Sequence, residues 1–264
     1  MNLFECHDVH YSYQGRFPAL CGIDLTIEKG LRVALVGTNG SGKSTLLSLL
    51  DGLVQPQRGR VLFAGRELTE AALQDEAFSL DFRRRVGLVF QNPDVQLFCP
   101  TVREDIAFGP LQLGFAPEVV EKRIEVLAQD LGITALLDRP PHQLSVGEKR
   151  KVSFATVLAI EPEVLLLDEP TAGLDPRTTT HLIELLHQAA HQGRTIVTAT
   201  HDLHTLPDIA DLVYVFGQDK RLAASGTPDE ILANHALLEA NNLIHVHHHH
   251  THDHRKYHWD SSAD

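Results

Sequence analysis

The chain has 264 residues, 43% hydrophobic and 22% charged, a composition typical of a folded globular protein with one large domain or one domain and a subdomain. Its formal net charge is −12, from 35 acidic and 23 basic residues, which argues against a surface that neutralises DNA or RNA phosphates. We therefore expect no nucleic-acid partner.

Cysteine content and the N-terminal sequence predict a cytosolic chain. The three cysteines are odd in number and lack C-x-x-C spacing, which favours a reducing compartment over a disulfide framework. The opening MNLFECHDVH lacks a signal-peptide pattern, and no window approaches 18 uncharged apolar residues. Membrane association is therefore expected to come through a partner.

The first half of the chain changes from strand patterns to helix patterns. Residues 1–35 alternate short apolar runs with polar breaks, which predicts a β-rich N-terminal edge. A Leu-rich helix is predicted over 44–53, and strands over 61–65 and 86–90. Residues 92–160 then contain apolar residues at helical spacing, which predicts a helical insert.

The second half predicts a parallel sheet. Its short, nearly continuous apolar runs alternate with helical stretches, as in strands that are covered on both faces. These runs are VLLLDEP (164–170), RTIVTATH (194–201) and LVYVFG (212–217), and a final helix is predicted over 228–241. The expected fold is α/β, with an N-terminal antiparallel β edge and a helical subdomain.

A glycine-rich stretch, GTNGSGKS at residues 37–44, fits the phosphate-loop pattern G-x-x-x-x-G-K-[ST] between a predicted strand and a predicted helix. Inward-facing backbone N–H groups and the helix N-terminus suit a phosphate, Lys43 would neutralise the β- and γ-oxygens, and Ser44 would ligate Mg²⁺. The alternative is a turn that merely joins strand to helix. The predicted nucleotide-binding residues are Gly37, Thr38, Asn39, Gly40, Ser41, Gly42, Lys43, Ser44 and Thr45.

Two carboxylates, Asp168 and Glu169, follow the strand 164–167. They are expected at the C-terminal edge of the sheet, where α/β proteins bind ligands. Asp168 can orient Mg²⁺ and its waters, while Glu169 can act as the base toward the water that attacks the γ-phosphate. Without the phosphate loop, the same pair would read equally well as a solvated turn.

The segment HQLSVGEKRKVSFATVLA (142–159) resembles the signature of ATP-binding cassette (ABC) ATPases, which implies a P-loop NTPase core. In that family, the signature loop of one subunit reaches the γ-phosphate held by the other subunit of a dimer. Ser145, Gly147 and Glu148 are thereby implied in nucleotide binding, since they stand at a predicted helix start. An ordinary helix N-cap is the alternative for this segment alone.

The resemblance assigns further single residues. Gln91 matches the glutamine that senses Mg²⁺ and the γ-phosphate, Asp175 matches the loop that communicates across the dimer, and His201 matches the histidine that contacts the γ-phosphate. Tyr13 matches the aromatic residue that stacks on adenine, with Tyr11 left open as the alternative. The implied catalytic residues are Glu169, His201, Lys43 and Gln91, and the implied Mg²⁺ ligands are Ser44, Gln91 and Asp168.

One departure from the family pattern concerns the signature, which usually has two glycines and then glutamine after the serine. This chain has Val146 at the first of those positions and Glu148 in place of the glutamine. If the first glycine requires φ > 0, a β-branched valine is strained there, and Glu148 adds negative charge near a polyphosphate. We expect these changes to slow or weaken dimer closure.

Within the ABC family, QNPDVQLF (91–98) and TVREDIAFGP (101–110) resemble the energy-coupling-factor (ECF) ATPases, particularly those of cobalt and nickel uptake. This resemblance implies an integral membrane coupling subunit and a substrate-binding membrane subunit as partners. Apolar contacts with a coupling helix are predicted for Phe98, Val102, Ile106 and Phe108. Packing of the same side chains within the helical insert is an equal alternative.

A histidine-rich tail ends the chain, and eight of the 17 histidines lie after residue 244. Imidazole suits nickel and cobalt, so the tail is predicted to collect or sense these ions, although an expression tag or an inert tail are alternatives. The candidate ligands are His245, His247, His248, His249, His250, His252 and His254. The predicted division is an ABC ATPase domain at 1–241 and a tail at 242–264.

Together these patterns predict the ATP-hydrolysing motor subunit of an ECF-type importer for nickel or cobalt, peripheral on the cytoplasmic face of the inner membrane. It would act as a homodimer or with a paralogue, with ATP and Mg²⁺ as cofactors. The alternatives are a soluble ABC ATPase of the iron–sulfur assembly type, an ECF importer for a vitamin, and a metal-binding module whose nucleotide site is regulatory.

Overall fold

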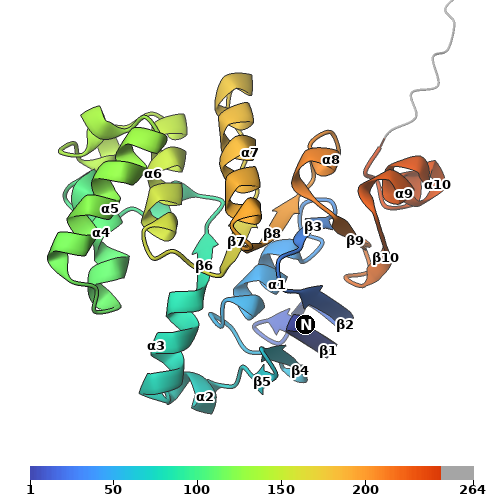
Figure 1. Cartoon of the computed structure of the whole chain (residues 1–264). Helices are drawn as coiled ribbons and strands as arrows, with labels where there is room; N and C mark the ends of the chain where they lie inside the picture. The colour runs from blue at the N-terminus through green and yellow to red at the C-terminus, as the bar shows by residue number, and fades with distance from the viewer. Residues whose placement is uncertain (245–264) are drawn as a thin grey trace, which may run out of the picture.

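The computed structural model describes residues 1–244, so the predicted histidine ligands from His245 onward lie outside the described residues. Two sheets form the framework (Figure 1). An antiparallel sheet has the order β2-β1-β4-β5, and its strands are β1 (Asn2–Tyr13), β2 (Phe17–Glu28), β4 (Arg58–Phe63) and β5 (Arg66–Glu67). The β-rich N-terminal edge is therefore confirmed.

The second sheet is parallel except at one edge. Its order is β10-β9-β3-β8-β7-β6, and among the described strands of this sheet only β10 pairs antiparallel, with β9. Strand β8 is buried along its whole length, as expected for a strand covered on both faces. The strands are β3 (Arg32–Val36), β6 (Val86–Val89), β7 (Val164–Asp168), β8 (Thr195–Thr200), β9 (Leu212–Phe216) and β10 (Leu222–Gly226).

Helix α1 (Lys43–Leu50) lies between the two sheets. Its leucines belong to one apolar cluster with residues of both sheets, including Phe4 from β1 and Leu166 from β7. The other described helices are α2 (Glu70–Gln74), α3 (Glu76–Arg85), α4 (Val102–Gln112), α5 (Pro117–Asp130), α6 (Val146–Leu158), α7 (Pro176–His191), α8 (Leu206–Ile209), α9 (Pro228–Ala233) and α10 (His235–Ala240), with short 3₁₀ turns at Pro93–Val95, Thr134–Leu136 and Pro141–Gln143.

The helical insert has an apolar core of its own. Helices α4, α5 and α6 surround a cluster that includes Val102, Ile106, Val120, Ile124 and Val152, separate from the clusters on the large sheet. These helices lie at one end of the molecule (Figure 1). The insert is therefore held largely by its own packing, in agreement with the helical spacing of its sequence; the domain boundaries themselves stay a prediction.

The prediction of a single helix over 228–241 is wrong. Helix α9 ends at Ala233 and α10 begins at His235, because Asn234 has the non-helical angles φ −88° and ψ 72°. The Asn234 side chain accepts a hydrogen bond from the N–H of Leu237, so it caps the second helix. Among residues 1–244, no helix combines the length and apolar character needed to cross a bilayer.

Replacing Asp51 with asparagine is expected to stabilise the fold at pH 8. Burial raises the pKa of this carboxyl at the end of α1 to about 7, against the opposing charge of Arg83. The raised pKa means that stability falls as the pH rises from about 4 to 7, because in that range the folded state still holds a proton that the unfolded state has already released.

Since the Asp51 side chain is only partly shielded from water, the expected gain is about 1–2 kcal/mol. Urea unfolding at pH 8 and pH 4 measures the difference. An equal effect of Asp51→Asn at both pH values would contradict the assignment.

Candidate functional site

The phosphate loop connects β3 to α1 at the C-terminal edge of the parallel sheet. Gly42 has φ 110°, and a Cβ atom at this position would lie 2.3 Å from the carbonyl oxygen of Ala19. A Cβ on Gly37 would lie 2.4 Å from Ser41 Oγ. Both positions therefore require glycine, because a side chain would collide with the packed turn.

Lys43, the first residue of α1, has a buried side chain that is only 5% exposed. Its ammonium donates to the carbonyl oxygens of Gly37 at 2.7 Å and Thr38 at 3.2 Å, so it lies inside the loop. Burial lowers the pKa of Lys43, while the nearby carboxylates of Glu169 and Asp168 oppose that shift. Lys43 thus places a positive charge in the loop, and the nearby negative charges are those of Glu169 and Asp168.

Ser44 and Asp168 meet across the site. Ser44 Oγ donates to Asp168 Oδ1 at 2.9 Å, which joins the start of α1 to the end of β7. Burial raises the pKa of Asp168, and the hydrogen bond from Ser44 partly offsets this. A hydroxyl beside a carboxylate is a hard oxygen donor set, so these two residues fit Mg²⁺. When bound, Mg²⁺ would neutralise phosphate oxygens there.

Glu169 lies beside Lys43 and His201. Its side chain is 6% exposed, and Oε1 lies 3.7 Å from Lys43 Nζ and 2.9 Å from His201 Nδ1. The backbone of Glu169 has φ 47°, and its N–H donates to the carbonyl oxygen of Ala199 in β8. The strained turn after β7 therefore directs the carboxylate toward the phosphate loop and not back into the sheet.

This arrangement can carry out a proton transfer beside a bound phosphate. Glu169 Oε2 accepts a long hydrogen bond of 3.4 Å from Thr200 Oγ1, so one carboxylate oxygen is oriented by β8 and the other by His201. A carboxylate fixed in this way can take a proton from water, and Lys43 is placed where it would neutralise the charge of a phosphate. The structure thus brings together the predicted residues Lys43, Ser44, Asp168, Glu169 and His201.

Five predicted site residues outside the phosphate loop, at Gln91, in the signature and at Asp175, have no hydrogen bond to that group among residues 1–244. Ser145 caps α6, and its Oγ donates to Glu148 Oε2 at 2.7 Å in a reciprocal capping box. Asp175 caps α7 through the N–H of Thr178. Gln91 follows β6 and is exposed, while Gly147 lies in the first turn of α6. The roles of all five in nucleotide contact stay predictions.

The expectation of strain at Val146 is wrong. Val146 is the first residue of α6 and its φ is not positive, so the helix begins without backbone strain. Its side chain is 60% exposed. Glu148 is engaged in the capping box, whose hydrogen bonds from Ser145 lower the pKa of its carboxyl. Valine is tolerated here because helix α6 needs no left-handed residue at its start.

The two tyrosines considered for adenine stacking differ in their surroundings. Tyr13 is 47% exposed, and its hydroxyl lies 3.1 Å from Thr45 Oγ1, immediately after the phosphate loop. Tyr11 is half-buried and packs against the apolar cluster between the sheets. The ring of Tyr13 is therefore available to a base, with Tyr11 packed edge-on against it at 5.1 Å.

Replacing Tyr13 with alanine is expected to raise the KM for ATP about tenfold, because base stacking on an aromatic ring is lost. Tyr13→Phe should keep the stacking and change the KM little. Steady-state ATPase assays of both variants, with Tyr11→Ala as the comparison, check this. A larger effect at Tyr11 than at Tyr13 would assign the base to the other ring.

Sequence reasoning missed two residues that hold the loop after β6. Arg150 is buried in α6, and its guanidinium donates to the carbonyl oxygen of Phe90 at 3.2 Å. Gln96 accepts from the N–H of Phe90 and donates to Ser153 O and Thr156 Oγ1, both at 2.8 Å. Helix α6 therefore fixes the residue next to Gln91. Arg150 stands at helical spacing from the buried Phe154 and Val157, and this spacing could have predicted from the sequence that Arg150 is buried.

The fold and site together define a P-loop ATPase of the α/β class. The family model described as ABC transporter matches residues 20–172, more than half of the chain. The chain is 51% identical over 244 residues to a nickel import ATP-binding protein, NikO, from Rhodobacter capsulatus, covering 91% of this chain and 95% of that protein.

Two further similarities extend the comparison. The energy-coupling factor transporter ATP-binding protein EcfA from Methanocaldococcus jannaschii is 42% identical, over 92% of this chain and 85% of that protein. The solved structure of CbiO1 from Clostridium perfringens, described as part of the transporter complex CbiONQ, aligns with TM-score 0.76 and 36% identity, over 92% and 95% of the two chains. The chain belongs to the ATP-binding proteins of the ABC transporter family, and it is accordingly an ABC-type ATPase.

Proposed function

We propose that this protein is the ATP-hydrolysing motor subunit of an ECF-type importer for nickel or cobalt ions, peripheral on the cytoplasmic face of the inner membrane. The observation that carries the proposal is the 51% identity to a nickel import ATP-binding protein along nearly its whole length. The similarities to an energy-coupling factor ATPase and to CbiO1 support the same class of transporter.

The motor step rests on the geometry around Glu169. This carboxylate takes a proton from the attacking water, Lys43 neutralises the γ-phosphate, and His201 holds Glu169 Oε1 at 2.9 Å. Ser44 and Asp168 would hold Mg²⁺. The signature residues Ser145 and Gly147 make no hydrogen bond to this group in the described part of the chain. In line with the resemblance to ABC ATPases, they would complete the site of a second copy or a paralogue in a dimer.

The membrane partner is proposed to dock beside Gln91. Phe98 and Phe108 are 65% and 43% exposed, and their rings meet edge to face at 5.0 Å, so they form an apolar surface next to the loop that α6 holds. Val102 and Ile106, predicted as further contacts, are fully buried in the core of the insert, so that prediction is wrong for them. An apolar helix of an integral membrane coupling subunit suits the two exposed rings.

Replacing Phe98 and Phe108 together with alanine is expected to abolish uptake while the isolated chain keeps its basal ATPase rate, because neither ring contacts the nucleotide site. The matched control is Leu53→Ala, another exposed apolar side chain that is 50% exposed. Uptake at the wild-type rate in the double variant would refute this docking surface.

Metal accumulation tests the proposed function as a whole. Cells that express this chain with its neighbouring membrane proteins are given radiolabelled nickel or cobalt, and wild type is compared with Glu169→Gln. Uptake of one ion that the variant loses supports the proposal and identifies the cargo. Absence of ATP-dependent uptake of either ion refutes it. Deletion of residues 245–264 in the same assay measures what the histidine-rich tail adds, and we expect a modest defect.

A further inference from the structure

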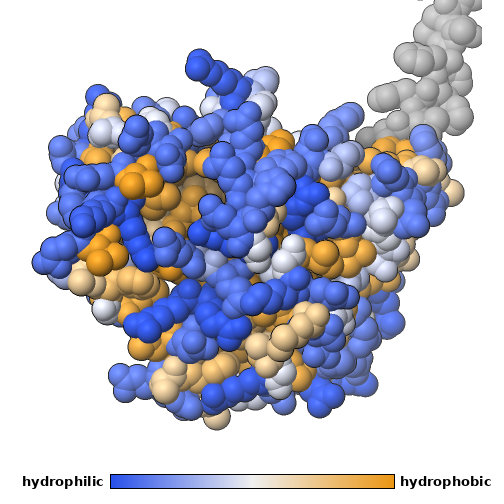
Figure 2. Space-filling model, in the orientation of Figure 1, coloured by the Kyte–Doolittle hydropathy of each residue, from blue (hydrophilic) through white to orange (hydrophobic). Residues whose placement is uncertain are grey.

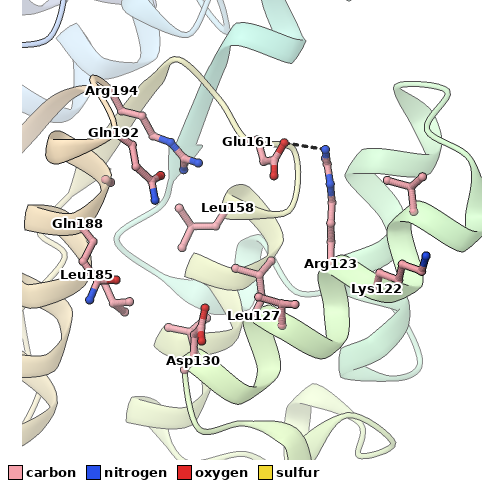
Figure 3. A pocket seen from close by; sticks show the side chains of 14 residues that line it. Lys122, Arg123, Leu127, Asp130, Leu158, Glu161, Leu185, Gln188, Gln192 and Arg194 are labelled. Atoms are coloured by element: carbon pink, nitrogen blue, oxygen red, sulfur yellow. Dashed lines mark hydrogen bonds and ion pairs between the residues drawn. The ribbon is translucent and has the colours of Figure 1, made fainter.

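A hollow of about 420 Å³ lies between α5 and α7, well away from the phosphate loop. Figure 3 shows side chains from both helices directed into it, together with Leu158 from the end of α6 and Arg194 from the turn before β8. In the space-filling view, an apolar recess separates the helical insert from α7 (Figure 2). The size lies within the range of pockets that bind small organic molecules.

The hollow lies on a seam between two packed units. The core of the insert and the cluster beneath α7 are separate, and Leu185 of α7 is only partly buried against the insert. Among the described residues, one side-chain hydrogen bond crosses from α7 to α5, between His181 Nε2 and the carbonyl oxygen of Asp130 at 3.2 Å. The two walls can therefore shift relative to each other at little cost in broken contacts.

The walls combine an apolar floor with an unpaired guanidinium, that of Arg194. Leu127, Leu158 and Leu185 line the floor. Arg194 makes no side-chain hydrogen bond or ion pair within residues 1–244, and burial lowers the pKa of its guanidinium, with Glu161 opposing. Glu161 is already occupied by Arg123, whose Nη2 lies 2.6 Å from its carboxylate.

Charged side chains of opposite sign lie at the two ends of the hollow. Arg194 and Asp130 lie at opposite ends (Figure 3). Lys122 adds a further cation on the α5 wall, next to Arg123. A ligand with a negative end would place it at Arg194, away from Asp130, because a guanidinium freed from other partners binds a carboxylate through two parallel hydrogen bonds. The leucine floor then takes an apolar body.

We propose that this hollow is a regulatory site for an amphipathic monocarboxylate, with its carboxylate on Arg194 and its hydrocarbon chain on the leucine floor. The bound molecule bridges α5 and α7, restrains the insert against the sheet and lowers ATP turnover. This inference does not depend on the identity of the transported ion.

Isothermal titration calorimetry of the full chain with sodium octanoate tests the site. Wild type and the control Arg60→Gln, an exposed arginine on β4, are expected to bind one octanoate per chain. Arg194→Gln should bind about tenfold more weakly, as should wild type with the neutral octanamide, because a charge-assisted hydrogen bond is lost. Val126→Trp, which fills the mouth of the hollow from an exposed position, should abolish binding.

ATPase rates measured with and without octanoate test the regulatory role, and the effect should disappear in Val126→Trp. Failure of octanoate to bind, or equal affinity in wild type, Arg194→Gln and Val126→Trp, overturns the site. Binding in the hollow that leaves the ATPase rate unchanged overturns the regulatory role. Neither result bears on metal uptake, so the proposed function is tested separately.

Discussion

Glu169→Gln is expected to lower the kcat of ATP hydrolysis by about 10²–10⁴-fold, because the amide cannot accept the proton of the attacking water. ATP binding should be retained, since Lys43 and the loop backbone are unchanged and the loop no longer faces a buried negative charge at 3.7 Å. The protein should then accumulate as an ATP-bound dimer, visible as a doubled mass in size-exclusion chromatography with light scattering.

The matched control is Glu118→Gln, an exposed glutamate in the first turn of α5 that should behave as wild type. A Glu169→Gln protein with normal turnover would remove Glu169 as the base. A protein that is inactive and also fails to bind ATP would show that the substitution damages the loop and not the chemistry.

The central elements were predictable from sequence because local signals and tertiary contacts agree there. The run 164–167 (VLLL) is apolar, and all four of its residues are buried in the structure. The glycine at position 42 carries the positive φ that its motif implies. Parallel strands end at one edge, so the positions of Asp168 and Ser44 next to each other followed from their places after a strand and at a helix start.

The errors arise where a single capping side chain, or packing between residues far apart in the sequence, decides the outcome. Asn234 ends one helix and caps the next, although the apolar spacing continues through it. Val102 and Ile106 are apolar, as the residues of a docking surface would be, and only the packing of the folded chain shows that they are buried. Arg150 stands between two lysines in a basic run, and its contact with Phe90 O depends on the approach of a strand that is 60 residues away in sequence.

Lys43→Ala is expected to weaken ATP binding about 10- to 100-fold, because the charge-assisted contact with the β- and γ-phosphates is lost. A second cost arises within the chain. The ammonium also faces Glu169 and Asp168, so its removal leaves two adjacent carboxylates in a shielded site without their nearest cation. The nucleotide-free protein should therefore unfold at a lower urea concentration than wild type.

The control for Lys43→Ala is Lys220→Ala. Lys220 also donates to the phosphate loop, at 2.6 Å to the carbonyl oxygen of Gly40, but this hydrogen bond is open to solvent and Lys220 faces no carboxylate of the site. Its loss should change ATP affinity and stability only slightly, as is usual for an exposed contact. Equilibrium binding of a fluorescent ATP analogue and urea unfolding measure both effects. Equal losses in the two variants would mean that the loop needs only its hydrogen bonds, whereas a loss confined to Lys43→Ala assigns the effect to the buried charge.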